Sequence, residues 1–434
     1  MKFCTTIFLV MLGFRLAAQT GIATKENSFT NFLSLESVVN EVLSNNPSLK
    51  AARANWEAMK ERVPQARAWD DARLGFDATA GRFVSVPQNS FSDQKVMAEQ
   101  TIPVTGKNRL RGQASNAEAA GAFAEFHRRE LDFTAKARIA FFRLANARAQ
   151  LELNRKNSEL LKQFSEITRR KYEAGTQSQS DFLSAETEVA KLQENTFDFR
   201  RQISDAETQL NILMNRPANA PLAAPENLVF QSLIFAVENI ETNALAHRPE
   251  LLIAQKKIEA AQARLEASRR EWIPEPSLRV EAVRYHGAAQ PISEVMAGIS
   301  FNLPWFNHKK YSAAIRENKK MLESAEHELE AARTETVGMV RDQLKKIDTF
   351  HHHAELFRNN LLPLARQTAD SKRLSYETDK AGFFDLLTSQ KSTQEIEAMY
   401  LNHLTEYRIA VAELESLVGI RMENFTNENK QEEK

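Results

Sequence analysis

The chain has 434 residues, 42% of them hydrophobic and 26% charged, a length that allows one to three domains around a large core. Lys plus Arg and Asp plus Glu both number 57, so the sequence lacks the basic excess expected of a nucleic-acid-binding protein or of a polybasic membrane-surface protein. Glycine and proline number only 13 each, which favours long uninterrupted helices.

The first 18 residues have the layout of a secretory signal, with an apolar run over 6–12 and a small-residue end at Ala17-Ala18. The only cysteine, Cys4, lies inside this segment, so the processed chain would carry neither a disulfide nor a cysteine for a lipid anchor. No later segment reaches the about 18 apolar residues of a membrane-spanning helix. Any membrane insertion must therefore use strands.

The first repeat is expected over 19–220. After an amphipathic helix, period-2 alternation predicts strands at about 72–82 and 93–102. A helical pattern without proline then runs over about 105–173, and a return helix with heptad spacing over about 181–215. At 1.5 Å per residue the long helix would reach roughly 100 Å.

A linker or equatorial segment at 221–240 leads to a second copy of the same order over 241–420, followed by a polar tail at 421–434. Its strands are expected at about 277–286 and 293–303, its long helix at about 306–377 with Pro363 as the only interruption, and its return helix at about 384–419. Asn46-Pro47-Ser48-Leu49 recurs as Arg248-Pro249-Glu250-Leu251, and Tyr172 and Asp181 recur as Tyr376 and Asp385. This is a tandem duplication rather than an array of small repeats.

The expected fold class is therefore mainly α with a small β part, in which sustained heptads give long antiparallel coiled coils. Four strands of about ten residues have the length of membrane-spanning strands. They could equally be two satellite hairpins outside any membrane. If they do span a membrane, oligomerisation is required, because four strands cannot close and an open edge cannot face lipid.

Several motifs together resemble the TolC-like outer-membrane efflux factors. They are Leu33-Ser34-Leu35-Glu36 leading to Asn45-Asn46-Pro47, the duplication, and Tyr172-x-x-Gly175 followed by Asp181-Phe182-Leu183-Ser184-Ala185-Glu186 at the bend. The resemblance covers nearly all of 33–419. Segments 102–107 and 303–307 resemble the heavy-metal branch of CusC and CzcC type.

The resemblance implies a homotrimer in the bacterial outer membrane and its lipid, with a shared β-barrel and a long periplasmic α-barrel. It implies an exit duct that passively conducts substrates, heavy-metal cations among the candidates, from an inner-membrane pump of RND type through a periplasmic adaptor. No enzymatic activity, cofactor, bound metal or nucleic-acid partner is expected, since metal-ligand, phosphate-loop and nucleophile motifs are lacking in the sequence. The alternative is a periplasmic coiled-coil adaptor or structural spacer.

Asp181 and Asp385 are the leading candidates for a pore or gate, together with Tyr172 and Tyr376 nine residues before them. In one interpretation each aspartate is simply the N-cap of its return helix. In the other, trimer symmetry gathers the carboxylates into rings that favour cations at a narrow end of the pore. The tyrosines would pack or hydrogen-bond across the bend and help to hold it closed.

The bends themselves are candidates for adaptor contact through Gly175 and Thr176 in the first and Asp379 and Gly382 in the second. The second bend departs from the first, because Asp379 stands where Gly175 is expected. His351-His352-His353 is interpreted as a solvated helix face, since successive helical residues point about 100° apart and cannot converge on one ion. His403, on the heptad seam, is interpreted as a packed polar residue.

Overall fold

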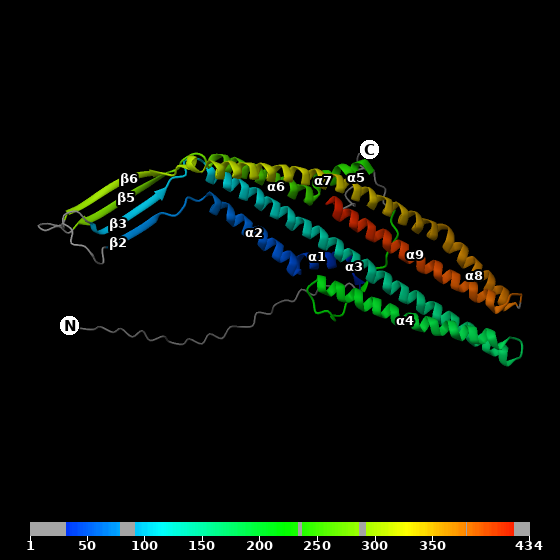
Figure 1. The fold of residues 1–434 in the computed structure, drawn as a ribbon. Helices are drawn as coiled ribbons and strands as arrows, with labels where there is room; N and C mark the ends of the chain where they lie inside the picture. The colour runs from blue at the N-terminus through cyan, green and yellow to red at the C-terminus, as the bar shows by residue number, and fades with distance from the viewer. Residues whose placement is uncertain (1–31, 79–91, 233–236, 286–291, 379, 421–434) are drawn as a thin grey trace, which may run out of the picture.

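The computed structural model describes residues 32–78, 92–232, 237–285, 292–378 and 380–420. The expected leader and polar tail lie outside these residues. The molecule is elongated, with a small sheet at one end and two helical bends at the other (Figure 1). The prediction of a mainly helical chain with a small β part is confirmed. Within the described residues, no helix is both long and apolar enough to cross a membrane.

The first half begins with two helices rather than one, because Asn46 ends α1 and starts α2. Its side-chain oxygen accepts hydrogen bonds from the amides of Ser48 and Leu49, and Pro47 occupies the first helical position, where no N–H is needed. The elements are β1 (Phe32–Leu33), α1 (Leu35–Asn45), α2 (Pro47–Arg67), β2 (Arg73–Ala78), β3 (Ser92–Thr101), α3 (Lys107–Glu173) and α4 (Gln179–Leu213).

The second half repeats this order, but its first helix begins inside the segment expected to be a linker. The elements are β4 (Ala224–Pro225), α5 (Val237–His247), α6 (Pro249–Arg270), β5 (Pro276–Tyr285), β6 (Ile292–Phe301), a 3₁₀ turn η1 (Pro304–Asn307), α7 (His308–Leu356), a π turn η2 (Phe357–Leu361), α8 (Leu362–Glu377) and α9 (Phe383–Val418). The short strands β1 and β4 pair in parallel, so the linker segment lies against the start of the first repeat.

The second long helix is not continuous. Pro363 has no N–H to donate to Asn359, and its ring would collide with that carbonyl in a regular α-helix. The π turn Phe357–Leu361 ends two residues before Pro363 and widens the helix where the collision would occur. The first repeat has no proline at this level, and α3 runs unbroken for 67 residues, about 100 Å.

Helix α3 is the centre of the molecule. It packs against α2 and α6 on the side nearer the sheet and against α4 and α9 on the side nearer the bends (Figure 1). Helix α7 packs on α6 and α9, and α8 continues along α9. The helices thus form a curved layer, with α2 and α4 along one border and α7 and α8 along the other.

The two predicted hairpins join into one antiparallel sheet in the order β2-β3-β5-β6. The join is the β3–β5 pair, in which Val96 lies opposite Ala282 and Ala98 opposite Val280. The interpretation as two separate satellite hairpins is therefore wrong. Strands β2 and β6 are the open edges of the sheet, and each continues the border of the helical layer on its own side.

Candidate functional site: the sheet and the helical bends

One face of the sheet is apolar and exposed over all four strands. Leu278 lies opposite Ile299, and Val280 opposite Ala297, so the apolar positions of neighbouring strands fall in register. Leu74 is 82% exposed and Val295 is 75% exposed. The positions of this apolar face are Leu74, Phe76 and Ala78 in β2, Val96 and Ala98 in β3, Leu278, Val280 and Ala282 in β5, and Val295, Ala297, Ile299 and Phe301 in β6.

The opposite face carries the charges. Glu281 is buried there and forms ion pairs with Lys95 at 2.8 Å and with Arg279 at 3.7 Å. Register places Glu99 directly between Arg73 and Arg279, so opposite charges alternate across three strands. A soluble protein would bury the apolar face, and this sheet leaves it exposed.

Large aromatic side chains lie where the sheet meets the helices. Trp69 follows α2, and Trp305 and Phe306 follow β6; all three are more than half exposed. Trp272 packs on Tyr311 nearby, with ring centroids 5.7 Å apart. These aromatic residues border the apolar face at the end of the sheet nearest the helices.

The first bend is a glycine-dependent helix end. Gly175 has φ of +73°, a left-handed conformation, and the Thr176 amide donates to the Lys171 carbonyl at 2.9 Å. In the second bend the Lys380 amide donates to the Ser375 carbonyl at 2.8 Å, the same pattern of chain reversal. Asp379 lies outside the described residues. Gly382 is the N-cap of α9 with φ of −72°, which any residue can adopt.

Neither aspartate is an N-cap, so that interpretation is wrong in both repeats. Ser178 caps α4 and Gly382 caps α9, which places Asp181 and Asp385 three residues later in the first helical turn. An acid there is favoured by the positive end of the helix dipole. Asp181 accepts a hydrogen bond from the Gln177 side chain at 2.8 Å, and Asp385 pairs with Lys372 on α8 at 3.3 Å.

The two tyrosines have different environments. Tyr376 is only 3% exposed, stacks edge-on against Phe383 at 5.9 Å, and reaches Thr168 on α3 with a hydroxyl–hydroxyl distance of 3.5 Å. Lys171 lies over its ring at 4.5 Å. Tyr376 therefore ties the second bend to the first helical hairpin. Tyr172 is 41% exposed, although the repeat predicts the same role for both.

A groove runs between α4 and α9 from the bends toward the equator, which the sequence reasoning missed. Its two adjoining hollows have volumes of about 660 and 340 Å³. Leu183 and Phe384 line the outer hollow and are 51% and 73% exposed. The sequence held one sign of this groove: Leu183 and Phe384 are large apolar residues that lie next to the heptad positions rather than on them.

Glu188 of α4 lies where the two hollows meet. Its carboxylate binds Lys191 at 2.8 Å and Lys391 of α9 at 3.2 Å. Burial raises the pKa of Glu188, but the hydrogen bonds from the two lysines outweigh it and hold that pKa below its usual range. The groove therefore has exposed apolar side chains near the bends and charged side chains nearer the equator.

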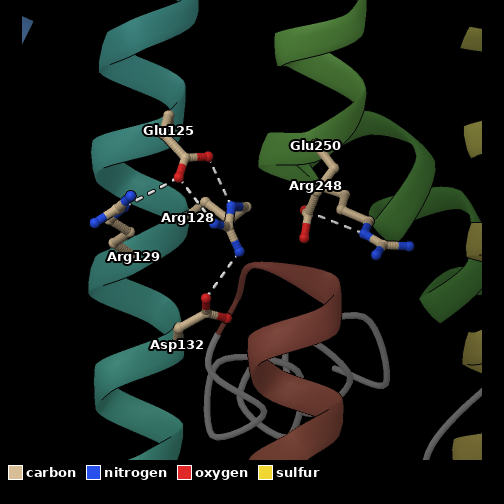
Figure 2. Close-up of polar contacts among 6 residues, drawn as sticks. All are labelled: Glu125, Arg128, Arg129, Asp132, Arg248 and Glu250. Carbon is tan, nitrogen blue, oxygen red and sulfur yellow. Dashed lines mark hydrogen bonds and ion pairs between the residues drawn. The ribbon is translucent and has the colours of Figure 1, made fainter. Parts of the chain in front are cut away.

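Two groups of ion pairs, one within α3 and one at the start of α6, lie side by side at the level of the equator (Figure 2). Arg128 of α3 donates to Glu125 and to Asp132, and Arg129 also donates to Glu125. The hydrogen bonds with Glu125 raise the pKa of Arg128, and those with Arg128 lower the pKa of Glu125. At the N-cap of α6, the buried Arg248 pairs with Glu250 and donates to Thr336 of α7. These charges are mutually neutralised and serve packing.

The histidine triplet is not a uniformly solvated face. His351 hydrogen-bonds Ser232 at 2.9 Å and His353 packs on His403 with ring centroids 4.8 Å apart, while His352 is exposed. His403 is packed between helices, as predicted. Across the described residues, His, Cys, Asp and Glu nowhere gather in threes around a point that could hold a metal ion.

Comparisons with known proteins agree with this geometry. The family model described as "Outer membrane efflux protein" matches residues 38–216 and 242–420. The chain is 22% identical to the toluene efflux pump outer membrane protein TtgC of Pseudomonas putida, over 94% of this chain and 84% of that protein. It is also 22% identical to the cobalt-zinc-cadmium resistance protein CzcC of Cupriavidus metallidurans, over 89% and 90%.

Among solved structures, the outer membrane protein VceC of Vibrio cholerae superposes with a TM-score of 0.75, covering 89% of this chain and 96% of that chain at 17% identity. These similarities support an exit duct and give no support to the adaptor or spacer alternative. The chain belongs to the outer membrane efflux protein family, and it is a TolC-like channel of the bacterial outer membrane that extends into the periplasm.

Proposed function

We propose that three copies of this chain form the duct, with the sheets continuing from protomer to protomer into one closed barrel. The observation that carries this proposal is the sheet with open edges at β2 and β6 and an exposed apolar face. An open edge cannot face lipid, and three copies would together supply twelve strands. The β2 border of one protomer would meet the β6 border of the next, a head-to-tail contact that closes into a ring.

The apolar face would face the hydrocarbon and the charged face would line the lumen. A ten-residue strand such as β6 extends about 34 Å, or about 26 Å along the membrane normal at a tilt of about 40°. That length matches the apolar band of about 25 Å in outer-membrane barrels. The aromatic residues at the end of the sheet nearest the helices would lie at the periplasmic interface of the membrane.

The helical bends would then form the periplasmic end and dock the adaptor. Exposed Leu183 and Phe384 at the mouth of the groove between α4 and α9 suit an amphipathic helix laid into it. Gly175 and Thr176 of the first bend and Gly382 of the second would belong to the same adaptor-docking end, as would Asp379, which lies outside the described residues. No energy source is built into a passive duct, so an inner-membrane pump, of RND type as the resemblance implies, would drive transport through the adaptor.

Asp181 and Asp385 would line the constriction at these bends. Carboxylates from three chains in a narrow space attract cations and resist simultaneous ionisation. Heavy-metal cations remain the proposed cargo class on the resemblance in segments 102–107 and 303–307. The relatives do not select it, because those named for toluene and for metals are equally similar to this chain.

Fractionation and crosslinking test the proposal together. The processed chain should appear in the outer-membrane fraction as a heat-modifiable trimer, and soluble periplasmic material would contradict it. Leu183→Cys and Phe384→Cys should crosslink to the adaptor in cells. The control is Met321→Cys, which is 60% exposed on α7 and far from the bends. Crosslinks at position 321 alone would show that the adaptor docks nearer the sheet than the bends, and would contradict the proposal.

A further inference from the structure

Two histidines with no role in the proposed duct lie beside the π turn, the one place in the described helices where a long helix changes its pitch. His353 is on α7, four residues before the π turn Phe357–Leu361, and His403 faces it from α9. Their rings meet at 60°, with centroids 4.8 Å apart. Phe357, the first residue of the π turn, packs edge-on against His403 at 5.0 Å.

The surroundings of this pair are mostly apolar. Phe350 lies 6.5 Å from His353 and 6.3 Å from His403, ring centroid to ring centroid. The Nδ1 atom of His353 is buried and has no hydrogen-bond partner among the described residues. Glu406 on α9 is the acid that favours a positive charge on His403, and it offsets the effect of burial only in part.

Two imidazoles are too few for a stable metal site. A structural zinc ion takes four protein ligands, and the described residues provide no third ligand that converges with this pair. A proton needs no such set, because histidine titrates near neutral pH without further partners. The geometry therefore favours a response to protons over one to metals.

We propose that the His353–His403 pair is an acid-sensitive latch between α7 and α9, closed when both rings are neutral and opened when acid places a positive charge on both of them. Two imidazolium ions at this spacing repel each other in an apolar environment. The π turn beside them interrupts the regular α-helical hydrogen bonds, so the helix bends there when the two rings move apart. Helix α8 leads from that turn to the second bend, and its position relative to α9 changes with the latch.

The direction of the pH dependence follows from the groups around His403. Burial and the neighbouring His353 lower the pKa of His403, and Glu406 on the same helix offsets this only in part. Arg358 of the π turn lies over the Phe230 ring, 5.7 Å from its centroid, and is not among the groups that shift the pKa of His403. A histidine whose pKa is lowered by folding binds fewer protons in the folded state, so the packed contact is fully stable above about pH 6.5 and loses stability as the pH falls.

Hydrogen exchange on intact trimers in lipid nanodiscs tests the latch at about pH 7.5 and about pH 5.5, after correction for the intrinsic pH dependence of exchange. Amides of Phe357–Leu361 should exchange faster at the acid pH, by up to about tenfold for each unit of pKa difference between packed and open states. His403→Phe keeps an aromatic ring in the contact and should abolish the acid response, as should His353→Phe. The control is His327→Gln on the same helix, whose side chain is 74% exposed and which should leave the response intact.

An acid response that persists unchanged in both Phe variants would overturn the latch. So would a wild-type trimer whose π-turn amides exchange equally at both pH values, a result that needs no variant to fold. Neither result bears on the duct, because trimer formation and location are read separately.

Discussion

The assignment of the two sheet faces can be tested by placing an arginine on each side of one strand. Ala297 and Met296 are neighbours near the middle of β6, but Ala297 is on the apolar face and Met296 on the charged face. At the bilayer midplane a lipid-facing arginine costs about 2 to 4 kcal/mol in a membrane barrel. Ala297→Arg should therefore destabilise each protomer by that amount, and a trimer by about three times as much.

Met296→Arg should be far better tolerated. Met296 lies directly opposite Glu281, which already forms ion pairs with Lys95 and Arg279. The new cation would therefore join an existing network of charges. The expected cost is within about 0.5 to 1 kcal/mol. Ala297→Gln controls for side-chain size without charge.

The cost should also depend on depth. Phe301 is on the same apolar face at the end of β6 nearest the helices, where an arginine is expected to cost only about 0 to 1 kcal/mol. The assay is urea unfolding of the protein inserted in lipid vesicles, with the yield of heat-modifiable trimer in cells as a second readout. Equal losses for Ala297→Arg and Met296→Arg, or a greater loss at Phe301 than at Ala297, would refute the assignment.

Further predictions concern the bends. Gly175→Ala should cost about 1 kcal/mol in thermal unfolding because of the left-handed backbone, whereas Gly382→Ala, at φ of −72° and with open space around its Cβ, should cost nothing. Tyr376→Ala should lose about 3 kcal/mol of local stability and raise amide exchange at both bends, since it empties a buried contact between the hairpins. Replacing Asp181 and Asp385 together by Asn should lower cation selectivity in single-channel recordings while costing under about 1 kcal/mol per helix; unchanged selectivity would leave only their dipole interaction.

Periodicity predicted most of this architecture because the elements are long and uniform. An unbroken helical pattern of some seventy residues or a heptad repeated along a whole return helix leaves few alternatives. The pairing of β3 with β5 could not be predicted in the same way, since the partners lie far apart in the chain and either hairpin alone satisfies the alternation. Only the register shows that Leu278, Val280 and Ala282 continue the apolar face of both neighbours.

The interpretation of the aspartates as N-caps, one of the two considered, was wrong for a related reason. An aspartate followed by two apolar residues is a common helix start, but Ser178 caps equally well and allows an acid in the first turn as well. Sequence alone could not separate these two arrangements, which differ by less than one turn. The groove between α4 and α9 was missed because it depends on how two distant hairpins pack.

A repeated sequence does not give a repeated environment, and Tyr172 and Tyr376 show why. Each ends a long helix nine residues before the matching aspartate, yet only Tyr376 is buried. Helix α3 packs against both α4 and α9, so the first hairpin has the second hairpin as a neighbour on its inner side, and Tyr376 enters that contact through Thr168. The matching position of the first repeat, Tyr172, is exposed, in the hairpin whose α4 lies along a border that one chain leaves open. In a ring of such chains that border would meet the next protomer, so exposed members of matched pairs are the residues to examine first for contacts between copies.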